Sequence, residues 1–183
     1  MVVAPERVSR FLSFLLRHNP KQYSLQFDRQ GFVPLSQLLA LVQERFEGVT
    51  AAEVQNVITE SDKKRFELID GKVRATYGHS VPVELGLEPV VPPAELYYGT
   101  ARDLAHNILR AGLGPRDRQH VYLTESWAEA LAVGRRKDPL PAVLVVSSLL
   151  AHGDGIRFYR SGKLYLTDQI PARFLSLREE AKT

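Results

Sequence analysis

Four basic residues stand beside the ends of predicted helices and strands, where a side chain with a fixed origin can bind an anion. Arg17 and His18 end the first predicted helix, Arg65 begins a predicted strand, and Arg118 lies just before another. A guanidinium group stays charged and offers planar donors that match phosphate oxygens. These residues therefore predict phosphate binding by three arginines and one imidazole. On local grounds alone, Arg17 and His18 could instead stabilise the negative end of a helix macrodipole, and Arg118 could belong to an ordinary surface loop.

A second candidate region is Tyr97-Tyr98-Gly99-Thr100, where a predicted strand meets a predicted helix. Gly99 would let a ligand phosphate approach the main chain, and Thr100 would cap a helix whose N-terminus favours anions. The same pattern also occurs in ordinary strand-to-helix connections. It therefore indicates a ligand site only together with other motifs.

The composition excludes several kinds of chemistry. The chain of 183 residues contains no cysteine, which excludes a disulfide scaffold, a thiolate nucleophile and a cysteine-ligated metal. Its histidines show no metal-ligand spacing, so we expect no metal, and neither a Rossmann nor a P-loop glycine motif occurs. The net charge of +3 suits a polyanionic partner such as nucleic acid. No apolar run has the length of a membrane span and no signal sequence is evident, so we expect a cytoplasmic protein without a membrane partner.

The first part of the chain has the pattern of a small helical domain with a hairpin. Apolar spacing predicts a helix over residues 6–19, a second helix from Ser36, and a third after the capping box Thr50-Ala-Ala-Glu53. Two strand-like runs then flank Asp70-Gly71, a dipeptide suited to a type I′ turn. This order predicts a winged-helix lobe over residues 1–80, a fold shared by nucleic-acid binders and protein-interaction domains.

The chain changes character after residue 80. Residues 81–94 are rich in Pro, Val and Gly, which suits neither a stable helix nor a central strand, and we interpret them as a linker. Residues 95–183 mix strands and helices without the alternation of a parallel α/β fold, which predicts an α+β domain. The predicted strands are 96–98, 120–123, 142–147, 156–159 and 164–167, and the predicted helices are 100–110 and 124–136.

Five motifs stand in order along the chain: Leu-Leu-Arg17-His18-Asn-Pro, Lys64-Arg65-Phe66, Val73-Arg74-Ala75-Thr-Tyr-Gly78-His79-Ser80, Leu96-Tyr-Tyr-Gly99-Thr100 and Arg118-Gln-His120-Val121-Tyr-Leu. Taken together, these motifs resemble the NAD-dependent RNA 2′-phosphotransferase family. The resemblance covers about residues 8 to 175, and the order and spacing of the motifs match as well.

The resemblance implies a fold, a reaction and its partners. The expected fold is a winged-helix RNA lobe followed by an ADP-ribosyltransferase-like lobe that binds NAD. An internal 2′-phosphate of RNA, as in tRNA splicing and processing, would attack the nicotinamide ribose of NAD and expel nicotinamide. The ribose 2″-hydroxyl would then attack the phosphate, which yields 2′-hydroxyl RNA and ADP-ribose 1″,2″-cyclic phosphate. RNA and NAD are the expected partners, no metal is implied, and we expect a monomer.

The resemblance also assigns residues. The family's catalytic arginines and histidine correspond to Arg17, His18, Arg65 and Arg118. We expect Arg65 and Arg118 at the RNA phosphate, Arg17 there or at the NAD diphosphate, and His18 near the reacting ribose. Such fixed cations would stabilise charge that develops in the transition state. The expected NAD contacts are His79, Ser80, Tyr98, Gly99, Thr100, Gly112 and Leu113.

Three departures from the family pattern bear on these assignments. Tyr98 and Tyr122 stand where the family usually has histidine, and Ser161-Gly162-Lys163 stands where it has Asn-Gly-Val. Tyr98 leaves the ribose contact open, although its hydroxyl can hydrogen-bond. Two alternative functions also remain at this point. One is an ADP-ribosyltransferase that caps terminal phosphates of RNA or DNA, and the other is a non-catalytic winged-helix binder of nucleic acid.

Overall fold

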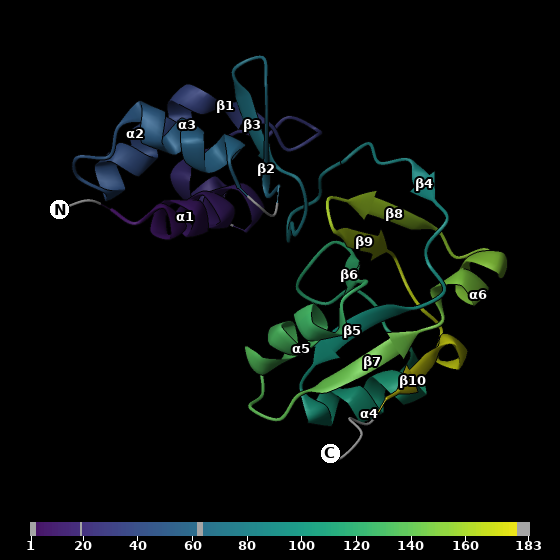
Figure 1. Cartoon of the computed structure of the whole chain (residues 1–183). Helices are drawn as coiled ribbons and strands as arrows, with labels where there is room; N and C mark the ends of the chain where they lie inside the picture. The colour runs from purple at the N-terminus through teal and green to yellow at the C-terminus, as the bar shows by residue number, and fades with distance from the viewer. Residues whose placement is uncertain (1–2, 19, 62–63, 179–183) are drawn as a thin grey trace. The chain divides into compact units, whose positions relative to one another are not determined.

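The computed structural model describes residues 3–18, 20–61 and 64–178. The chain forms two compact units, Met1–Gly86 and Leu87–Thr183 (Figure 1). Each unit combines helices with an antiparallel sheet, which agrees with the predicted mixture of helices and strands. Among the described residues, no helix has both the length and the apolar composition needed to cross a membrane.

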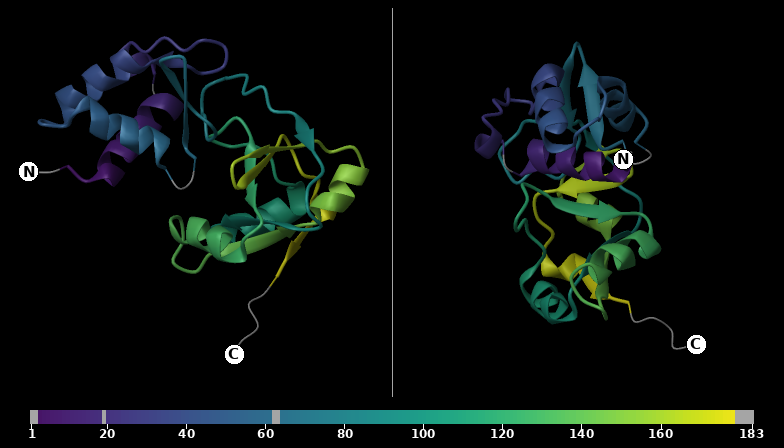
Figure 2. Two further views of the ribbon diagram at one scale, coloured as in Figure 1. Left: turned by 45° about the horizontal axis from the view of Figure 1, so that its top comes forward. Right: turned by 90° about the vertical axis from the view of Figure 1, so that its left-hand side faces the viewer.

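The first unit contains the three predicted helices. They are α1 (Pro5–Arg17), α2 (Leu35–Arg45) and α3 (Ala51–Thr59). Helix α3 begins with the predicted capping box, because Thr50 accepts from the main-chain N–H of Glu53 while the Glu53 carboxylate accepts from Thr50. A short 3₁₀ turn, Lys21–Tyr23, follows α1. In both views of Figure 2 these helices gather beside the hairpin of the same unit.

A three-stranded antiparallel sheet completes the first unit. Its order is β1 (Val33–Pro34), β3 (Lys72–Ala75) and β2 (Phe66–Ile69). The β2–β3 hairpin turns at Asp70 (φ 47°) and Gly71 (φ 73°), as predicted for a type I′ turn. Sequence patterning missed β1, because a strand of two residues is too short to show alternation.

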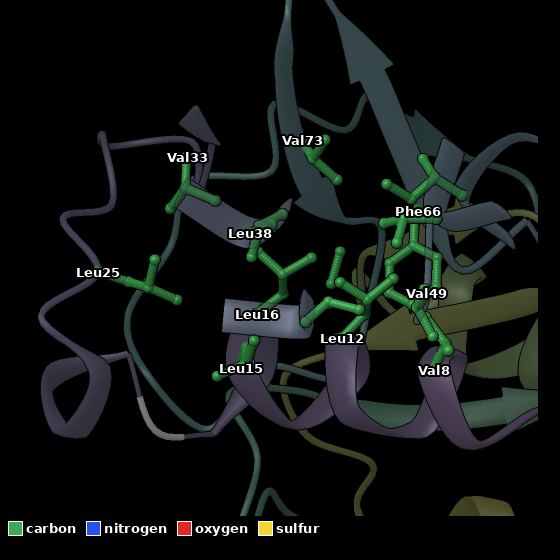
Figure 3. Packing of buried hydrophobic residues seen from close by; sticks show 14 residues of the cluster. Val8, Leu12, Leu15, Leu16, Leu25, Val33, Leu38, Val49, Phe66 and Val73 are labelled. Atoms are coloured by element: carbon green, nitrogen blue, oxygen red, sulfur yellow. The ribbon is translucent and has the colours of Figure 1, made fainter. Parts of the chain in front are cut away.

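The core of the first unit forms where α1 packs beneath α2, α3 and the sheet. Leu12, Leu15 and Leu16 of α1 are fully buried. In Figure 3 they point toward Leu38 of α2 and Val73 of β3. Each large apolar side chain buried in this way contributes about 1.5–3 kcal/mol. This packing fixes both ends of α1, including the end that carries Arg17 and His18.

The second unit is built on a seven-stranded antiparallel sheet with the order β10-β7-β5-β6-β9-β8-β4. The predicted strands are present within a few residues of their expected ends, whereas β4 and β10 were missed. The strands are β4 (Pro89–Val90), β5 (Leu96–Thr100), β6 (Val121–Thr124), β7 (Ala142–Val146), β8 (Phe158–Ser161), β9 (Leu164–Thr167) and β10 (Leu175–Leu177).

Two helices pack against the central strands of this sheet. Helix α4 (Arg102–Ala111) packs against β7 and β10 over an apolar core, and α5 (Trp127–Arg135) packs against β5. A third helix, α6 (Ser148–Gly153), follows β7, and a 3₁₀ turn, Ala172–Phe174, precedes β10. Helix α4 starts two residues later, and α5 three residues later, than the sequence predicted.

Residues 81–94, which were predicted as a linker, include the boundary between the two units at Gly86 and Leu87. Val83 and Leu85 are buried in the first unit, which extends to Gly86. Beyond it, β4 pairs with β8 as the edge strand of the second sheet. An edge strand tolerates Pro89, because one side of the strand needs no main-chain donor. The proline-rich composition therefore marked an edge strand as well as a boundary.

Candidate active site

The end of α1 is tied to the segment that follows β3 through Ser80. The Ser80 N–H donates to the carbonyl oxygen of Arg17 at 2.9 Å, and the Ser80 hydroxyl donates to the same oxygen at 3.1 Å. His18 Nδ1 lies 3.1 Å from the Ser80 hydroxyl oxygen. Ser80 thus holds two adjacent candidate catalytic residues. It contacts Arg17 through the main-chain carbonyl oxygen and His18 through an imidazole nitrogen.

The Ser80 hydroxyl can form hydrogen bonds with both Arg17 and His18 if the hydrogens are arranged in one particular way. A carbonyl oxygen can only accept, so the hydroxyl donates its single hydrogen to Arg17. The hydroxyl oxygen then accepts from the Nδ1–H group of His18. In this arrangement the neutral ring carries its hydrogen on Nδ1 and has Nε2 as its unprotonated nitrogen. Ser80, predicted as an NAD contact, is therefore a partner of His18 in the structure.

Arg17 is a buried cation, with only 8% of its surface exposed. Its guanidinium carbon lies 4.6 Å from the centroid of the Tyr77 ring, in the geometry of a cation–π contact. Burial and ring contact restrict the rotamers that the side chain can adopt. Arg17 is therefore pre-oriented, which an electrostatic catalyst requires.

Arg65 lies beside the middle of α1. Its Nη1 donates to the Ser9 hydroxyl at 3.3 Å, and its carbonyl oxygen accepts from Thr76 N at 3.0 Å. Ser9 precedes Arg17 by two helical turns, about 12 Å along the axis, but helical side chains lean toward the N-terminus. The first unit thus places Arg17, His18 and Arg65 along one helix. Ser9 was not predicted as a site residue.

His79 occupies the interior of the first unit. It has no exposed surface, and its Nε2 lies 3.6 Å from the position that a Cβ atom on Gly31 would take. Gly31 has φ +82°, so its main chain also favours glycine. The structure gives His79 a packing position, and its predicted contact with NAD stays a prediction.

In the second unit, Gly99 is required by packing against α5. A Cβ atom on Gly99 would lie 1.7 Å from the carbonyl oxygen of Ala130, a distance that no side chain tolerates. Gly134 shows the reciprocal constraint, because its Cβ would lie 3.3 Å from Thr100 N and 2.6 Å from Pro141 Cβ. The structure thus gives Gly99 a packing role, because the helix main chain fills the space that a side chain would take, and its predicted contact with a ligand phosphate stays a prediction.

The prediction that Thr100 caps helix α4 was wrong. Thr100 is the last residue of β5 and is 1% exposed, and the N-cap of α4 is Ala101. The Asp138 carboxylate accepts from the main-chain N–H of Arg102 at 3.0 Å and of Leu140 at 2.9 Å. These bonds hold the pKa of Asp138 below its usual range. The helix N-terminus therefore already has an anionic partner from within the chain.

Gly112 and Leu113 close the C-terminal end of α4. Gly112 has φ +94°, and a Cβ atom there would meet the carbonyl oxygen of Ile170 at 2.9 Å. Leu113 is buried, and its N–H and carbonyl group both bond to Ile170 at 2.8 Å. These two residues have structural roles in the fold, and their predicted place beside the adenosine of NAD stays a prediction.

Tyr98, Tyr122 and Arg118 lie around the loop that leads into β6. The Arg118 guanidinium carbon lies 5.9 Å from the centroid of the Tyr122 ring. Burial is the largest influence on the Tyr98 hydroxyl and raises its pKa. The charge of Arg116 lowers this pKa and the charge of Asp117 raises it, each by less than burial does. Tyr98 is therefore a neutral hydrogen-bond donor at physiological pH. Tyr98 and Tyr122 are thus both near the loop that carries Arg118.

A polar hollow of about 280 Å³ lies at the start of α5. Within it, Thr124 donates to the Glu129 carboxylate at 2.8 Å, and Ser126 caps the helix by accepting from Glu129 N. Lys163, one of the departures from the family pattern, also lines the hollow. No sequence motif marked the other lining residues, which come from two segments of the chain, 124–129 and 160–163. The lining residues are Thr124, Glu125, Ser126, Glu129, Arg160 and Lys163.

The described residues contain no group of three or more His, Cys, Asp or Glu side chains placed to hold a metal ion. What they do contain is Arg17 and His18 at the end of α1, Arg65 in contact with Ser9 of the same helix, and, in the second unit, Arg118 over the Tyr122 ring. This arrangement can bind anions, orient an imidazole and donate hydrogen bonds from a neutral phenol. It suits phosphate chemistry that depends on positioning and fixed charge.

Comparisons with known proteins identify the family. The model of the family described as RNA 2′-phosphotransferase, Tpt1 / KptA family, matches residues 4–169. A protein of Acetivibrio thermocellus named "Probable RNA 2′-phosphotransferase" is 40% identical over 172 residues, which cover 92% of this chain and 94% of the relative. A protein of the same name from Agrobacterium fabrum is 42% identical over 176 residues, or 94% of each chain. One from Thermococcus kodakarensis is 33% identical over 173 residues, which cover 94% of this chain and 96% of the relative. The chain therefore belongs to the RNA 2′-phosphotransferase family, whose members are named as transferases.

Proposed function

We propose that the protein removes an internal 2′-phosphate from RNA by transferring it to NAD. The observation that carries the proposal is the Arg17–His18 pair, held by Ser80 at the end of α1 in a member of this family. The pair offers a fixed cation for phosphate and an imidazole whose hydrogen is directed to Nδ1. Arg65 and Arg118 supply the remaining charge.

We assign the two units to the two substrates. The first unit, with three helices and a β2–β3 hairpin, serves as a winged-helix RNA-binding lobe. The second unit, with α4 and α5 on an antiparallel sheet, serves as an ADP-ribosyltransferase-like lobe that binds NAD. This division matches the chemistry, because each unit supplies part of the cationic set.

The reaction has two steps that balance without a metal or a redox partner. In the first, a phosphate oxygen on the RNA attacks C1″ of the nicotinamide ribose, the glycosidic C–N bond breaks, and nicotinamide leaves with the bonding electrons. In the second, the ribose 2″-hydroxyl attacks phosphorus, and the bond from phosphorus to the RNA 2′-oxygen breaks. The hydroxyl proton ends on the RNA 2′-oxygen. The products are 2′-hydroxyl RNA and ADP-ribose 1″,2″-cyclic phosphate.

The protein residues act mainly on charge and proton position. A phosphate dianion is already nucleophilic, so the first step needs orientation more than a base. The second step concentrates negative charge around phosphorus, where Arg65 and Arg118 stabilise it, with Arg17 at this phosphate or at the NAD diphosphate. His18 accepts the proton of the 2″-hydroxyl at Nε2, the nitrogen that the Ser80 contact keeps unprotonated.

The second unit has groups that suit an anionic dinucleotide. Tyr98 and Thr100 flank Gly99 on β5, and the close packing of Gly99 on α5 fixes their main chain. Arg160 and Lys163 bring two cations to the polar hollow beside α5, and Glu125 and Glu129 bring two carboxylates. We propose that the NAD diphosphate and riboses bind along this side of the unit, between Arg118 and the hollow.

Product analysis tests the proposal directly. The protein is incubated with NAD and an oligoribonucleotide that carries one internal 2′-phosphate, and the products are identified by mass spectrometry. We expect nicotinamide, ADP-ribose 1″,2″-cyclic phosphate and the 2′-hydroxyl oligonucleotide, and none of these with the matched 2′-hydroxyl substrate. A stable ADP-ribosylated phosphate end would instead show a capping ADP-ribosyltransferase. Bound RNA without release of nicotinamide would show a non-catalytic binder.

A further inference from the structure

An open hollow of about 340 Å³ lies between α1 and the end of α2, and no step of the proposed reaction uses it. Three arginines and three phenylalanines line it, and no carboxylate does. We call it the α1–α2 hollow; its lining residues are Arg7, Arg10, Phe11, Phe14, Arg45 and Phe46.

The aromatic side chains of the α1–α2 hollow form a connected framework. Phe11 contacts the Phe46 ring edge-on at 5.7 Å between centroids and the Tyr23 ring at 5.9 Å. Arg7 lies over the Phe46 ring at 5.5 Å. Phe14 contacts Tyr23 at 6.2 Å, yet 38% of its surface is exposed. The framework therefore holds one aromatic ring partly open to solvent, beside cations.

The charges of the hollow select an anionic partner. Arg7, Arg10 and Arg45 are all exposed and come from two helices, so three positive charges converge on one apolar floor. A cation–aromatic surface of this kind matches single-stranded nucleic acid, whose phosphates pair with arginine and whose bases stack on aromatic rings. A protein partner would need acidic side chains at several fixed positions, whereas RNA provides a negative charge at every nucleotide.

The hollow lies within reach of a strand that occupies the candidate active site of the same unit. Arg10 and Arg17 are seven residues apart on α1, so they point in nearly the same direction and are about 10.5 Å apart along the axis. An RNA strand that places its 2′-phosphate at Arg17 can therefore place a neighbouring nucleotide at Arg10.

We propose that the α1–α2 hollow is a second RNA-binding site, which holds a nucleotide flanking the reacting one. Arg7, Arg10 and Arg45 contact the phosphates, and a base stacks on Phe14. The inference rests on the proposed function in one respect: the substrate is RNA. It adds that affinity for the substrate grows with the length of single strand around the 2′-phosphate.

Binding of plain RNA tests the hollow separately from catalysis. Fluorescence anisotropy gives Kd for a labelled single-stranded 12-mer without a 2′-phosphate and without NAD. We expect the triple variant R7A/R10A/R45A to weaken Kd at least tenfold, and to lower the slope of log Kd against log salt by about 2, at about 0.7 per phosphate contact. Phe14→Ala should weaken Kd about fivefold or more, and Phe14→Trp should retain it.

A second triple variant controls for net charge. Arg135, Arg136 and Lys137 are exposed residues of the second unit, and their replacement by alanine removes the same three charges. We expect this variant to bind the 12-mer within twofold of the wild type. Equal losses in both triple variants, or a Kd within twofold for R7A/R10A/R45A, would overturn the proposal. Thermal unfolding confirms that each variant is folded.

Kinetics connect the hollow to the reaction. With 2′-phosphorylated substrates, we expect R7A/R10A/R45A to raise KM for the 12-mer at least tenfold, with kcat and the KM for a 2′-phosphorylated dinucleotide unchanged. An equal rise for both substrates would overturn a flanking site. If the wild type transfers no phosphate at all, the proposed function fails, and the Kd measurements on plain RNA still decide whether the hollow binds RNA.

Discussion

The Ser80 hydroxyl oxygen lies 3.1 Å from both the carbonyl oxygen of Arg17 and Nδ1 of His18. Ser80 is 62 residues beyond His18 in the chain, so the contact depends on the packing of the β3 segment against α1. A small change in that packing would change the orientation of the His18 imidazole and the nitrogen that carries its hydrogen. It would leave the arginine side chains unchanged. Ser80 is thus a positioning residue, and its effect can be separated from that of the arginines.

We expect Ser80→Ala to lower kcat about two- to tenfold, the size of one lost neutral hydrogen bond, with little change in KM for RNA. The ring nitrogens of His18 provide a direct readout, because ¹⁵N chemical shifts distinguish the two neutral tautomers. In the wild type we expect a protonated Nδ1 and an unprotonated Nε2, and in Ser80→Ala a mixture of tautomers. Ser80→Thr, which keeps the hydroxyl, should restore both. The same tautomer in wild type and Ser80→Ala would contradict the assignment.

Arg65 should act through its geometry as well as its charge. We expect Arg65→Ala and Arg118→Ala each to lower kcat by roughly 10² or more, as when one transition-state donor is removed. Arg65→Lys should also be impaired, because a point charge cannot reproduce two parallel donors. Single-turnover rates with the 2′-phosphorylated oligonucleotide measure these effects.

Arg29→Ala serves as the matched control for Arg65, since Arg29 is an exposed arginine of the same unit outside the candidate site. Its single-turnover rate should equal that of the wild type. Wild-type rates in both Arg65→Ala and Arg118→Ala would refute the catalytic assignment. Full activity in Arg65→Lys would show that simple Coulomb attraction suffices.

Local sequence signals predicted the helices and the β2–β3 hairpin, because their main-chain hydrogen bonds join residues close together in the chain. The spacing of Val8, Phe11, Leu12 and Leu15, the Thr50–Glu53 capping box and the Asp70-Gly71 turn all act within a few residues. The short strands β1, β4 and β10 could not be predicted in this way. Their two or three residues become strands only because a partner strand far along the chain satisfies their main-chain groups.

The candidate site shows the same division. The motifs pointed to Arg17, His18 and Arg65, but the partner of each depends on distant segments that no local pattern reveals. Gly99 is the clearest case, because glycine next to a strand end fits both ligand approach and helix packing. The packing role becomes visible only from the position of the Ala130 carbonyl oxygen, which belongs to helix α5, further along the chain. Sequence spacing alone could not have revealed it.

Gly99→Ala should destabilise the second unit. The added Cβ would meet the α5 main chain, which cannot move away without disrupting its contact with β5, so we expect a loss of at least about 1–3 kcal/mol in the free energy of unfolding. Gly114→Ala is the matched control, because a Cβ there meets nothing within 4 Å and should change stability by less than about 0.5 kcal/mol. Urea unfolding measures both. A Gly99→Ala protein of wild-type stability that no longer binds NAD would favour ligand approach after all.

Asp138 should make the stability of the second unit depend on pH. Main-chain N–H groups of Arg102 and Leu140 hold the pKa of its carboxyl below the usual 3.8. Because the folded-state pKa is the lower one, the stabilisation is fully present above pH 3.8 and is lost as the pH falls through the folded-state value. We therefore expect Asp138→Asn to be less stable than the wild type at pH 7. The difference should shrink as the pH falls from about 5 toward 2.

Urea unfolding of Asp138→Asn and the wild type at several pH values measures this difference. Glu88→Gln is the control, since it removes an exposed carboxylate for which the structure describes no such main-chain bonds. Its stability should follow that of the wild type at every pH. A gap between Asp138→Asn and the wild type that stayed constant from pH 7 to pH 2 would mean that the substitution destabilises the unit for a reason other than the loss of charge. The charge of Asp138 would then have no part in holding the helix N-terminus.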